Sequence, residues 1–250
     1  MSRYAGPGAA HSGRDACGGC GARGLRRTAP GRVTTREFRE RLLRRARRSN
    51  TPVHTEWIEP LERYFNLLAR RNAKINLTAL PLQEPTDQTF DRLLIEPLAA
   101  ARFLVNEPDA WWDLGSGGGS PAIPLKISHP LLNLRMVEAK ARKAVFLREA
   151  VRFLEIDHAV VVNKRFDELD DADPDYGSGR FVTVRAVRAD RQLFSSAARL
   201  LRSRGHLLLF RPTNRVISPD GYRYLESAQL IDAPRTYLTA LERSTWNKGG

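Results

Sequence analysis

The chain has 250 residues, enough for one domain of ordinary size with an extension, and its 42% hydrophobic composition allows a packed core. No apolar run approaches the roughly 18 residues that cross a bilayer, which argues against a membrane role and favours the cytoplasm. The formal net charge is +13, and residues 1–50 hold 13 arginines against three acidic residues. Such a basic excess favours a polyanionic partner such as RNA.

Residues 1–33 are rich in Gly, Ala and Arg and lack apolar periodicity, so we predict a disordered basic arm there. A mitochondrial transit peptide and an overextended translation start are alternatives that the residues leave open. The only cysteines, Cys17 and Cys20, lie in this arm. Their spacing supplies half of a zinc site that His11 does not complete, so we expect no metal and a reducing compartment.

Helices are predicted over residues 34–48, 56–72 and 86–104, the last interrupted at Pro97, and together they form a helical subdomain over 34–108. In the first helix, Phe38, Leu42 and Ala46 recur every four residues on one face. The opposite face is basic and either contacts nucleic acid or is solvated. Its cations are Arg41, Arg44, Arg45, Arg47 and Arg48.

A second pattern covers residues 109–246, where short apolar runs alternate with amphipathic segments. Strands are predicted over 111–114, 134–138, 158–162, 181–185 and 205–210, helices over 121–128, 141–156 and 190–202, and a final hairpin over 221–242. This alternation predicts an α/β domain with a parallel sheet covered on both faces. Its ligand should lie at the carboxyl ends of the strands, where the strand order switches.

The first predicted strand ends in a glycine-rich turn, Asp-Leu-Gly-Ser-Gly-Gly-Gly-Ser over residues 113–120. Ser120 stands where the dinucleotide fingerprint G-x-G-x-x-G requires its last glycine, which disfavours a nicotinamide-dependent oxidoreductase. The G-x-G-x-G pattern, with Asp113 two residues before Gly115, is instead the form of class I methyltransferases that use S-adenosylmethionine (SAM). Glu138, about twenty residues further on, is placed to accept hydrogen bonds from both ribose hydroxyls.

Four segments follow one another in an order typical of a single family. Residues 72–78 match N-K-x-x-N-L-T, residues 113–124 match D-x-G-[ST]-G-x-G-x-P-G-x-P, residues 137–148 match V-E-S-x-x-K-K-x-x-F-L-R, and residues 183–187 match a strand end with R-A-V. Over roughly residues 56–212 the chain therefore resembles the RsmG (GidB) family, ribosomal RNA small-subunit methyltransferase G. Lys74 and Asn76 of the first segment are expected to anchor the helical subdomain to the core.

The resemblance implies a Rossmann-like class I fold with a mostly parallel seven-stranded sheet and SAM as cofactor. It implies methylation of guanine N7 in 16S ribosomal RNA of the 30S subunit, and we expect a monomer. Asp167 would accept from the adenine amino group, and Phe166 would flank the ring. The implied cofactor positions are Asp113, Gly115, Gly117, Ser120, Glu138, Phe166, Asp167 and Arg185.

Arg185, at the end of the fourth predicted strand, is the residue we expect to position the substrate or the cofactor. It would hold guanine O6, an RNA phosphate or the SAM carboxylate; the structural alternative is an ion pair, for instance with Asp113. No general base is expected, because N7 carries a free lone pair and alignment is the main task. The predicted core has no cysteine, which disfavours methylation at carbon 5 of a pyrimidine. Arg-Ala-Val stands in place of D/N-P-P-Y/F, which disfavours the adenine amino group.

The chain also departs from the family pattern. Ala122 replaces a loop glycine, and the family's R-H-I-x-D-S-x segment appears as residues 92–98, with Leu93, Glu96 and Pro97 in place of His, Asp and Ser. These changes motivate an alternative, a non-catalytic RNA-binding or ribosome-assembly factor on a methyltransferase fold.

Overall fold

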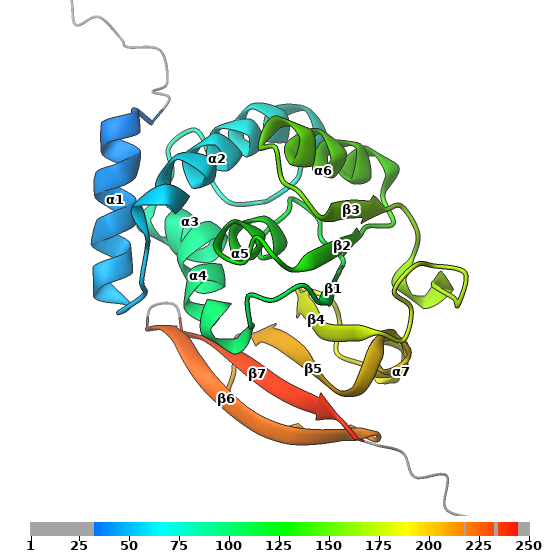
Figure 1. The fold of residues 1–250 in the computed structure, drawn as a ribbon. Helices are drawn as coiled ribbons and strands as arrows, with labels where there is room; N and C mark the ends of the chain where they lie inside the picture. Colours follow the sequence, from blue (N-terminus) through cyan, green and yellow to red (C-terminus); the bar gives the residue numbers. More distant parts are fainter. Residues whose placement is uncertain (1–32, 218, 233–234, 245–250) are drawn as a thin grey trace, which may run out of the picture. The chain divides into compact units, whose positions relative to one another are not determined.

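Seven strands form one sheet in the order β3-β2-β1-β4-β5-β7-β6 in the computed structural model (Figure 1). Strands β1 to β5 pair in parallel, and β7 runs antiparallel between β5 and β6. The predicted mostly parallel, seven-stranded sheet is therefore confirmed. The strands are β1 Ala110–Leu114, β2 Asn133–Val137, β3 Ala159–Val162, β4 Gly179–Arg185, β5 Leu201–Arg211, β6 Tyr222–Asp232 and β7 Arg235–Arg243.

The structure describes residues 33–217, 219–232 and 235–244. The predicted basic arm, apart from Val33, and the cysteine pair within it lie outside these residues. None of the helices within the described ranges is long and apolar enough to cross a membrane.

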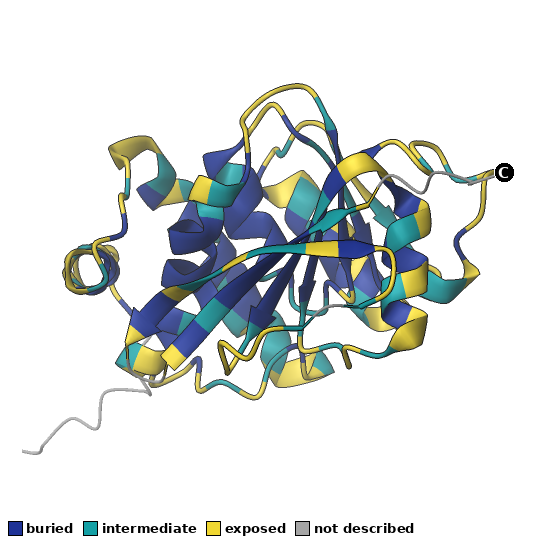
Figure 2. Cartoon of the chain, turned by 90° about the horizontal axis from the view of Figure 1, so that it is seen from below, coloured by how far each residue is buried: buried dark blue, intermediate teal, exposed yellow. Residues whose placement is uncertain are grey.

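The central strands β1 and β4 are buried on both faces, which explains why they are apolar runs rather than alternating ones. In β1 the side chain of Trp111 packs into one hydrophobic cluster and that of Trp112 into the other. The first cluster contains α2 Thr55–Ile75, α5 Ala122–Ser128 and α6 Ala141–Phe153; the second contains α7 Arg191–Leu200. Figure 2 shows the buried residues concentrated along the strands and the inner sides of these helices.

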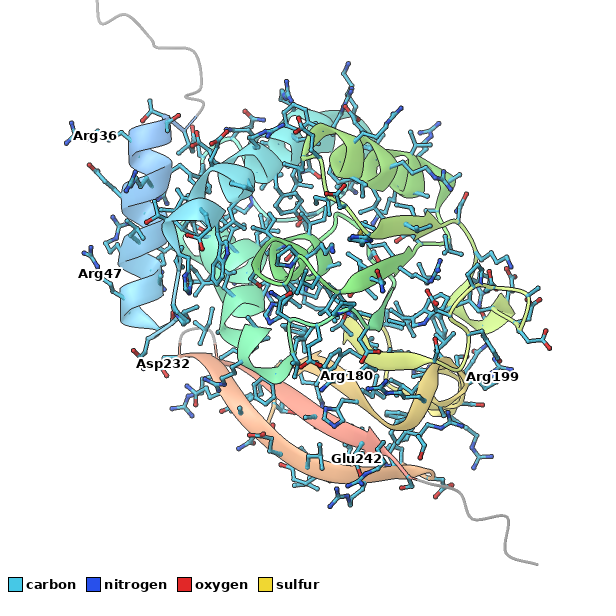
Figure 3. The ribbon with its side chains drawn as sticks, viewed as in Figure 1. Arg36, Arg47, Arg180, Arg199, Asp232 and Glu242 are labelled. Carbon is cyan, nitrogen blue, oxygen red and sulfur yellow. The ribbon has the colours of Figure 1, made fainter. Side chains whose placement is uncertain are left out.

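Helix α1, Thr35–Arg48, begins where Thr34 accepts a hydrogen bond from the Glu37 amide at 3.2 Å. Its apolar face is buried as predicted, but the prediction for its basic face is wrong in part. Arg45 is only 8% exposed and donates to both carboxylate oxygens of Asp91, at 2.8 and 2.5 Å. Arg41 and Arg44 turn toward Asp87. Figure 3 shows Arg36 and Arg47 pointing away from the neighbouring helices.

The helix expected over 86–104 is four short segments: α3 Asp87–Phe90, the π-helical turn η1 Asp91–Ile95, α4 Glu96–Ala100 and the 3₁₀ turn η2 Ala101–Phe103. The predicted break at Pro97 is wrong. Pro97 lies in the first turn of α4 and has no N–H to donate to the preceding turn, whose Arg92 and Leu93 carbonyls accept from Arg185 and Ser120 instead. The irregular segment is the π turn before it.

Other boundaries differ by a few residues. Helix α2 continues three residues beyond the expected end, to Ile75, and α6 ends at Phe153 rather than 156. β5 begins directly after α7, at Leu201, because the polar run before Gly205 is accommodated as a bulge against β4. The predicted C-terminal hairpin is present as β6 and β7.

Candidate active site

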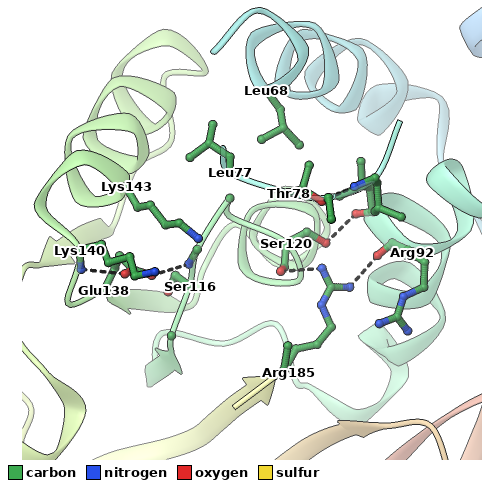
Figure 4. Close-up of a pocket in the computed structure, with 17 residues that line it drawn as sticks. Leu68, Leu77, Thr78, Arg92, Ser116, Ser120, Glu138, Lys140, Lys143 and Arg185 are labelled. Atoms are coloured by element: carbon green, nitrogen blue, oxygen red, sulfur yellow. Dashed lines mark hydrogen bonds between the residues drawn. The ribbon is translucent and has the colours of Figure 1, made fainter. Parts of the chain in front are cut away.

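The carboxyl ends of β1 and β4 meet where the strand order switches, and a cavity of about 510 Å³ opens there. Five of the eight predicted cofactor residues line it, together with the α2–α3 connection and the π turn (Figure 4). They are Gly115, Gly117, Ser120, Glu138 and Arg185. A switch point is where open α/β sheets bind ligands, and the volume suits a small molecule.

A smaller cavity of about 140 Å³ adjoins the first and shares Gly115 and Glu138 with it. Phe166 and Asp167, on the 3₁₀ turn η3 Phe166–Glu168, line this second cavity. Arg165 donates two hydrogen bonds to the Asp167 carboxylate, at 3.1 and 3.0 Å, which lowers the pKa of Asp167. The structure therefore brings both residues beside the glycine loop, with the carboxylate already held by a cation.

The glycine loop closes tightly over the end of the sheet. The Gly115 amide donates to the Val137 carbonyl at 2.9 Å, and the residue has a positive φ of 75°. A Cβ at this position would lie 2.7 Å from Cγ2 of Val187. Only glycine avoids both the backbone strain and this overlap.

Glu138 follows β2 directly, and its side chain is fixed before any ligand arrives. One carboxylate oxygen accepts from the Gly117 amide at 2.9 Å and the other from the Lys140 amide at 2.8 Å. An ionised carboxylate has about four acceptor sites, so two further donors can still bind. The residue lines the cavity and fits the two hydroxyls of a ribose.

Asp113 lies at the end of β1, 1% exposed and behind the loop. Its Oδ1 accepts from the Thr183 hydroxyl at 2.6 Å, and that hydroxyl accepts from Trp111 Nε1 at 2.9 Å. Its Oδ2 has no partner among the described residues. Burial raises the pKa of Asp113. Unlike the other predicted cofactor residues, Asp113 lines neither of the two cavities.

Arg185 holds the wall of the cavity together. Its guanidinium donates to the carbonyls of Arg92 at 2.6 Å and Ser120 at 2.7 Å, and Nη1 lies 3.7 Å from a carboxylate oxygen of Glu96 (Figure 4). The structural alternative, an ion pair, is therefore present, with Glu96 rather than Asp113 as the partner. Burial lowers the pKa of Arg185, and the charge of Glu96 opposes the effect.

The residues that depart from the family pattern belong to this same wall. Glu96 is 1% exposed and accepts from Arg92 Nη1 at 2.8 and 3.0 Å, and burial raises its pKa. The Leu93 carbonyl accepts from the Ser120 hydroxyl at 2.8 Å. The departures are therefore built into a bonded network that reaches the cavity.

Two residues of α2 were not foreseen as part of the site. The Tyr64 hydroxyl donates to the Gly118 carbonyl at 2.7 Å, although the helical period predicts Tyr64 only as an apolar contact. Asn72 Oδ1 accepts from the amides of Leu77 at 2.7 Å and Thr78 at 2.9 Å, which shapes the segment that lines the cavity. The position of Asn72 in the first family segment, residues 72–78, was the sequence feature that could have indicated this role.

The prediction that Lys74 and Asn76 anchor the helical subdomain is wrong. Both residues are exposed, and neither side chain makes a hydrogen bond within the described part of the chain. The Tyr64 hydroxyl, bonded to the Gly118 carbonyl, is the side chain that joins α2 to the glycine loop.

Comparison with known proteins gives a consistent result. The chain matches the GidB family model, described as rRNA small subunit methyltransferase G, over residues 57–217. Ribosomal RNA small subunit methyltransferase G of Xanthomonas oryzae pv. oryzae is 35% identical over 184 residues, which are 71% of this chain and 82% of that protein. The protein of the same name from Pseudomonas putida is 34% identical over 142 residues, 57% of this chain and 64% of that protein. A solved SAM dependent methyltransferase from Aquifex aeolicus superposes with a TM-score of 0.49 at 12% identity, covering 61% of this chain and 92% of that one.

The sheet order, the antiparallel β7 and the glycine-lined cavity at the switch point define a class I methyltransferase. The family model covers more than half of the chain. The chain therefore belongs to the GidB family of rRNA small subunit methyltransferases G. The predicted family, the class of enzyme and SAM as cofactor are confirmed.

Proposed function

We propose that this protein transfers the methyl group of SAM to N7 of a guanine in 16S ribosomal RNA of the 30S subunit. The observation that carries the proposal is the cavity at the switch point, built from the glycine loop, Glu138 and Arg185 in a chain of this family. We place the enzyme in the cytoplasm, as a monomer with no membrane partner.

Most of the predicted cofactor residues have chemistry that suits a particular part of SAM. Glu138 has acceptor sites for the ribose hydroxyls, and Phe166 with Asp167 forms the smaller cavity that suits the adenine. Gly115 and Gly117 allow close approach of the ligand to the backbone. Asp113 lies behind the glycine loop and lines neither cavity, so we assign it a supporting role at the end of β1 through its bond with Thr183. Ser120 and Arg185 fix the wall and thus position the cofactor indirectly.

The chemistry needs alignment rather than proton transfer. SAM, when bound, supplies a methyl group on a positively charged sulfur, and guanine N7 has a free lone pair and no proton to lose. The described cavity lining contains no histidine, cysteine or aspartate that would act as a base or nucleophile. Arg185 and Ser120 therefore contribute by holding the wall against which the two reactants are aligned.

The RNA must present its base at the open side of this cavity. N7 lies on the major-groove edge, which is too deep in an A-form helix for side chains to reach, so an unpaired or displaced guanine is the suitable substrate. Arg92, Lys140 and Lys143 line the cavity and supply positive charge for the phosphates of such a segment.

The alternative of a non-catalytic binding factor rested on Leu93, Glu96 and Pro97. In the structure these residues are accommodated: Glu96 is paired with Arg92 and Arg185, and Pro97 begins α4. The departures therefore give no reason to expect a lost reaction.

The test is transfer of radiolabelled methyl groups from SAM to unmodified 30S subunits, with the product nucleoside identified by chromatography and mass spectrometry. We expect labelled 7-methylguanosine. Label in another nucleoside would contradict the proposed atom, and SAM binding without any transfer would support the binding factor.

A further inference from the structure

We infer that a basic groove beside the SAM cavity binds the phosphates of RNA nucleotides that flank the target guanine. The groove is formed by Ile75–Ala79, at the end of α2, and Lys140–Lys143, at the start of α6. This inference rests on the proposed function, since it names the surface through which that same site holds its substrate.

The groove is continuous with the SAM cavity. Its volume is about 500 Å³, and five of its lining residues also line the cavity. These shared residues are Leu77, Thr78, Ala79, Lys140 and Lys143. A chain that enters the groove would therefore lead into the place where the methyl group is transferred.

The charge of the groove has one sign. Lys140, Arg142 and Lys143 line it, no acidic side chain does, and Lys74 precedes its first residue. Within the described part of the chain, none of these four cations has a carboxylate within 4 Å. Phosphate groups would supply the missing counter-charges and release counterions on binding.

Some basic residues near the groove have acidic partners. Arg71 of α2 donates to Glu149 of α6, and Lys164, in the loop after β3, pairs with Asp173 at 3.0 Å. Other arginines of α2 and α6, such as Arg148 and Arg152, lack an acidic partner among the described residues but do not line the groove. The groove differs from them in gathering three unpaired cations around one hollow that is continuous with the SAM cavity.

The groove is also held in shape. Asn72 accepts from the Leu77 and Thr78 amides, Leu77 is 5% exposed, and Figure 4 shows Lys143 extending toward the glycine loop. The exposed Asn76 side chain makes no hydrogen bond to any other described residue and adds polar donors to the groove. A preformed cationic groove without aromatic platforms suits the RNA backbone rather than stacked bases.

The experiment measures binding of unmodified 16S RNA as a function of salt for the full chain, together with SAM affinity by calorimetry and KM for 30S subunits. Arg142→Gln is the main variant, because Arg142 lines the groove but not the SAM cavity. Arg152→Gln is the matched control, an exposed arginine in the last turn of the same helix. A triple variant replaces Lys140, Arg142 and Lys143 with Gln.

We expect Arg142→Gln to lower the slope of log K against log salt by about 0.7, and the triple variant by about two, as lost phosphate contacts on a single strand require. KM for 30S subunits should rise, and SAM affinity of Arg142→Gln should equal that of wild type. Arg152→Gln should match wild type in all three measurements.

Equal salt slopes of RNA binding for Arg142→Gln, the triple variant and wild type would overturn the inference. If all three proteins still transferred methyl groups, the proposed function would stand. Absence of RNA binding by the wild type would overturn both. Binding with the expected slopes but without transfer would keep the groove and contradict the proposed reaction.

Discussion

At Gly115 a single added methyl group should have a large effect on the cofactor site. Gly115→Ala would combine the cost of a positive φ, about 1–2 kcal/mol, with an overlap against Val187. We expect SAM affinity, measured by calorimetry, to fall by roughly tenfold or more, as that energy alone implies. Gly221→Ala is the control: Gly221 has a φ of 81° and nothing within 4 Å of an added Cβ. Equal SAM affinity in both variants would contradict the assigned cradle.

Tyr64 tests the contact that ties α2 to the glycine loop. Tyr64→Phe leaves the Gly118 carbonyl without its donor, which costs about 1–3 kcal/mol. Part of this loss should appear as weaker SAM binding, because Gly118 lines the cavity. Tyr222→Phe removes an equivalent bond, 2.9 Å to the Phe194 carbonyl, outside that cavity. It should lower the thermal midpoint and leave SAM affinity unchanged; an equal loss of affinity in both would rule out a local role for Tyr64.

At this scale the sequence predicted the residues of the glycine loop better than their partners. Asp113, Gly115 and Glu138 follow from local spacing, because one strand, one turn and the next strand place them. Tyr64 bonds Gly118 across 54 residues of chain, and Glu96 pairs with Arg185 across a still longer stretch. No local pattern reveals contacts between residues so far apart. The cofactor roles of the predicted residues stay predictions until binding is measured.

Among the elements, the π turn η1 connects α1 to the cavity wall. Asp91 receives Arg45 of α1, and the next two carbonyls receive Arg185 and Ser120. Asp91→Asn would leave the buried Arg45 with only the more exposed Asp87, 3.2 Å away, as its counter-charge, so we expect a cost of up to roughly 3–5 kcal/mol. We expect a matching fall in the free energy of unfolding measured with urea. Glu40→Gln, which breaks the exposed pair with Arg36, should leave it nearly unchanged; similar effects of both would show that burial is not what matters.

The helical period predicted the apolar side of α1 and misassigned its arginines. Phe38, Leu42 and Ala46 are spaced for burial, but nothing in that spacing shows that Asp87 and Asp91 lie opposite Arg41 and Arg45. The π turn is equally invisible, since Leu93, Leu94 and Ile95 are as compatible with an ordinary α-helical turn.

For the whole molecule, the order of strands and helices predicted an α/β domain with a parallel sheet, and the family resemblance supplied the class I fold. Each β-α step along 110–200 is a local pattern, and parallel pairing with right-handed crossovers leaves few arrangements. The bulge in β5 was not predicted, because residues 202–205 have the composition of a turn. The hairpin β6–β7 was placed because its two strands flank a short connection.

Stability of the whole molecule should fall in mild acid because of His129. Burial lowers the pKa of His129, so the native ring stays neutral while the unfolded chain takes up a proton below about pH 6.5. The unfolded state then binds more protons, and the free energy of unfolding falls as pH decreases. His129→Gln should reduce this slope between pH 6.5 and 5 in urea titrations. Part of the slope should remain in this variant, because the pKa of His206 is lowered too. An unchanged slope would contradict the assignment to His129.

The measurement that tests the central claim most directly is labelled methyl transfer from SAM to unmodified 30S subunits by the wild type and by Gly115→Asp. The added carboxylate would occupy the cradle with bulk and negative charge. We expect 7-methylguanosine with the wild type and loss of both SAM binding and transfer with the variant. Transfer by Gly115→Asp at the wild-type rate would show that the reaction takes place elsewhere.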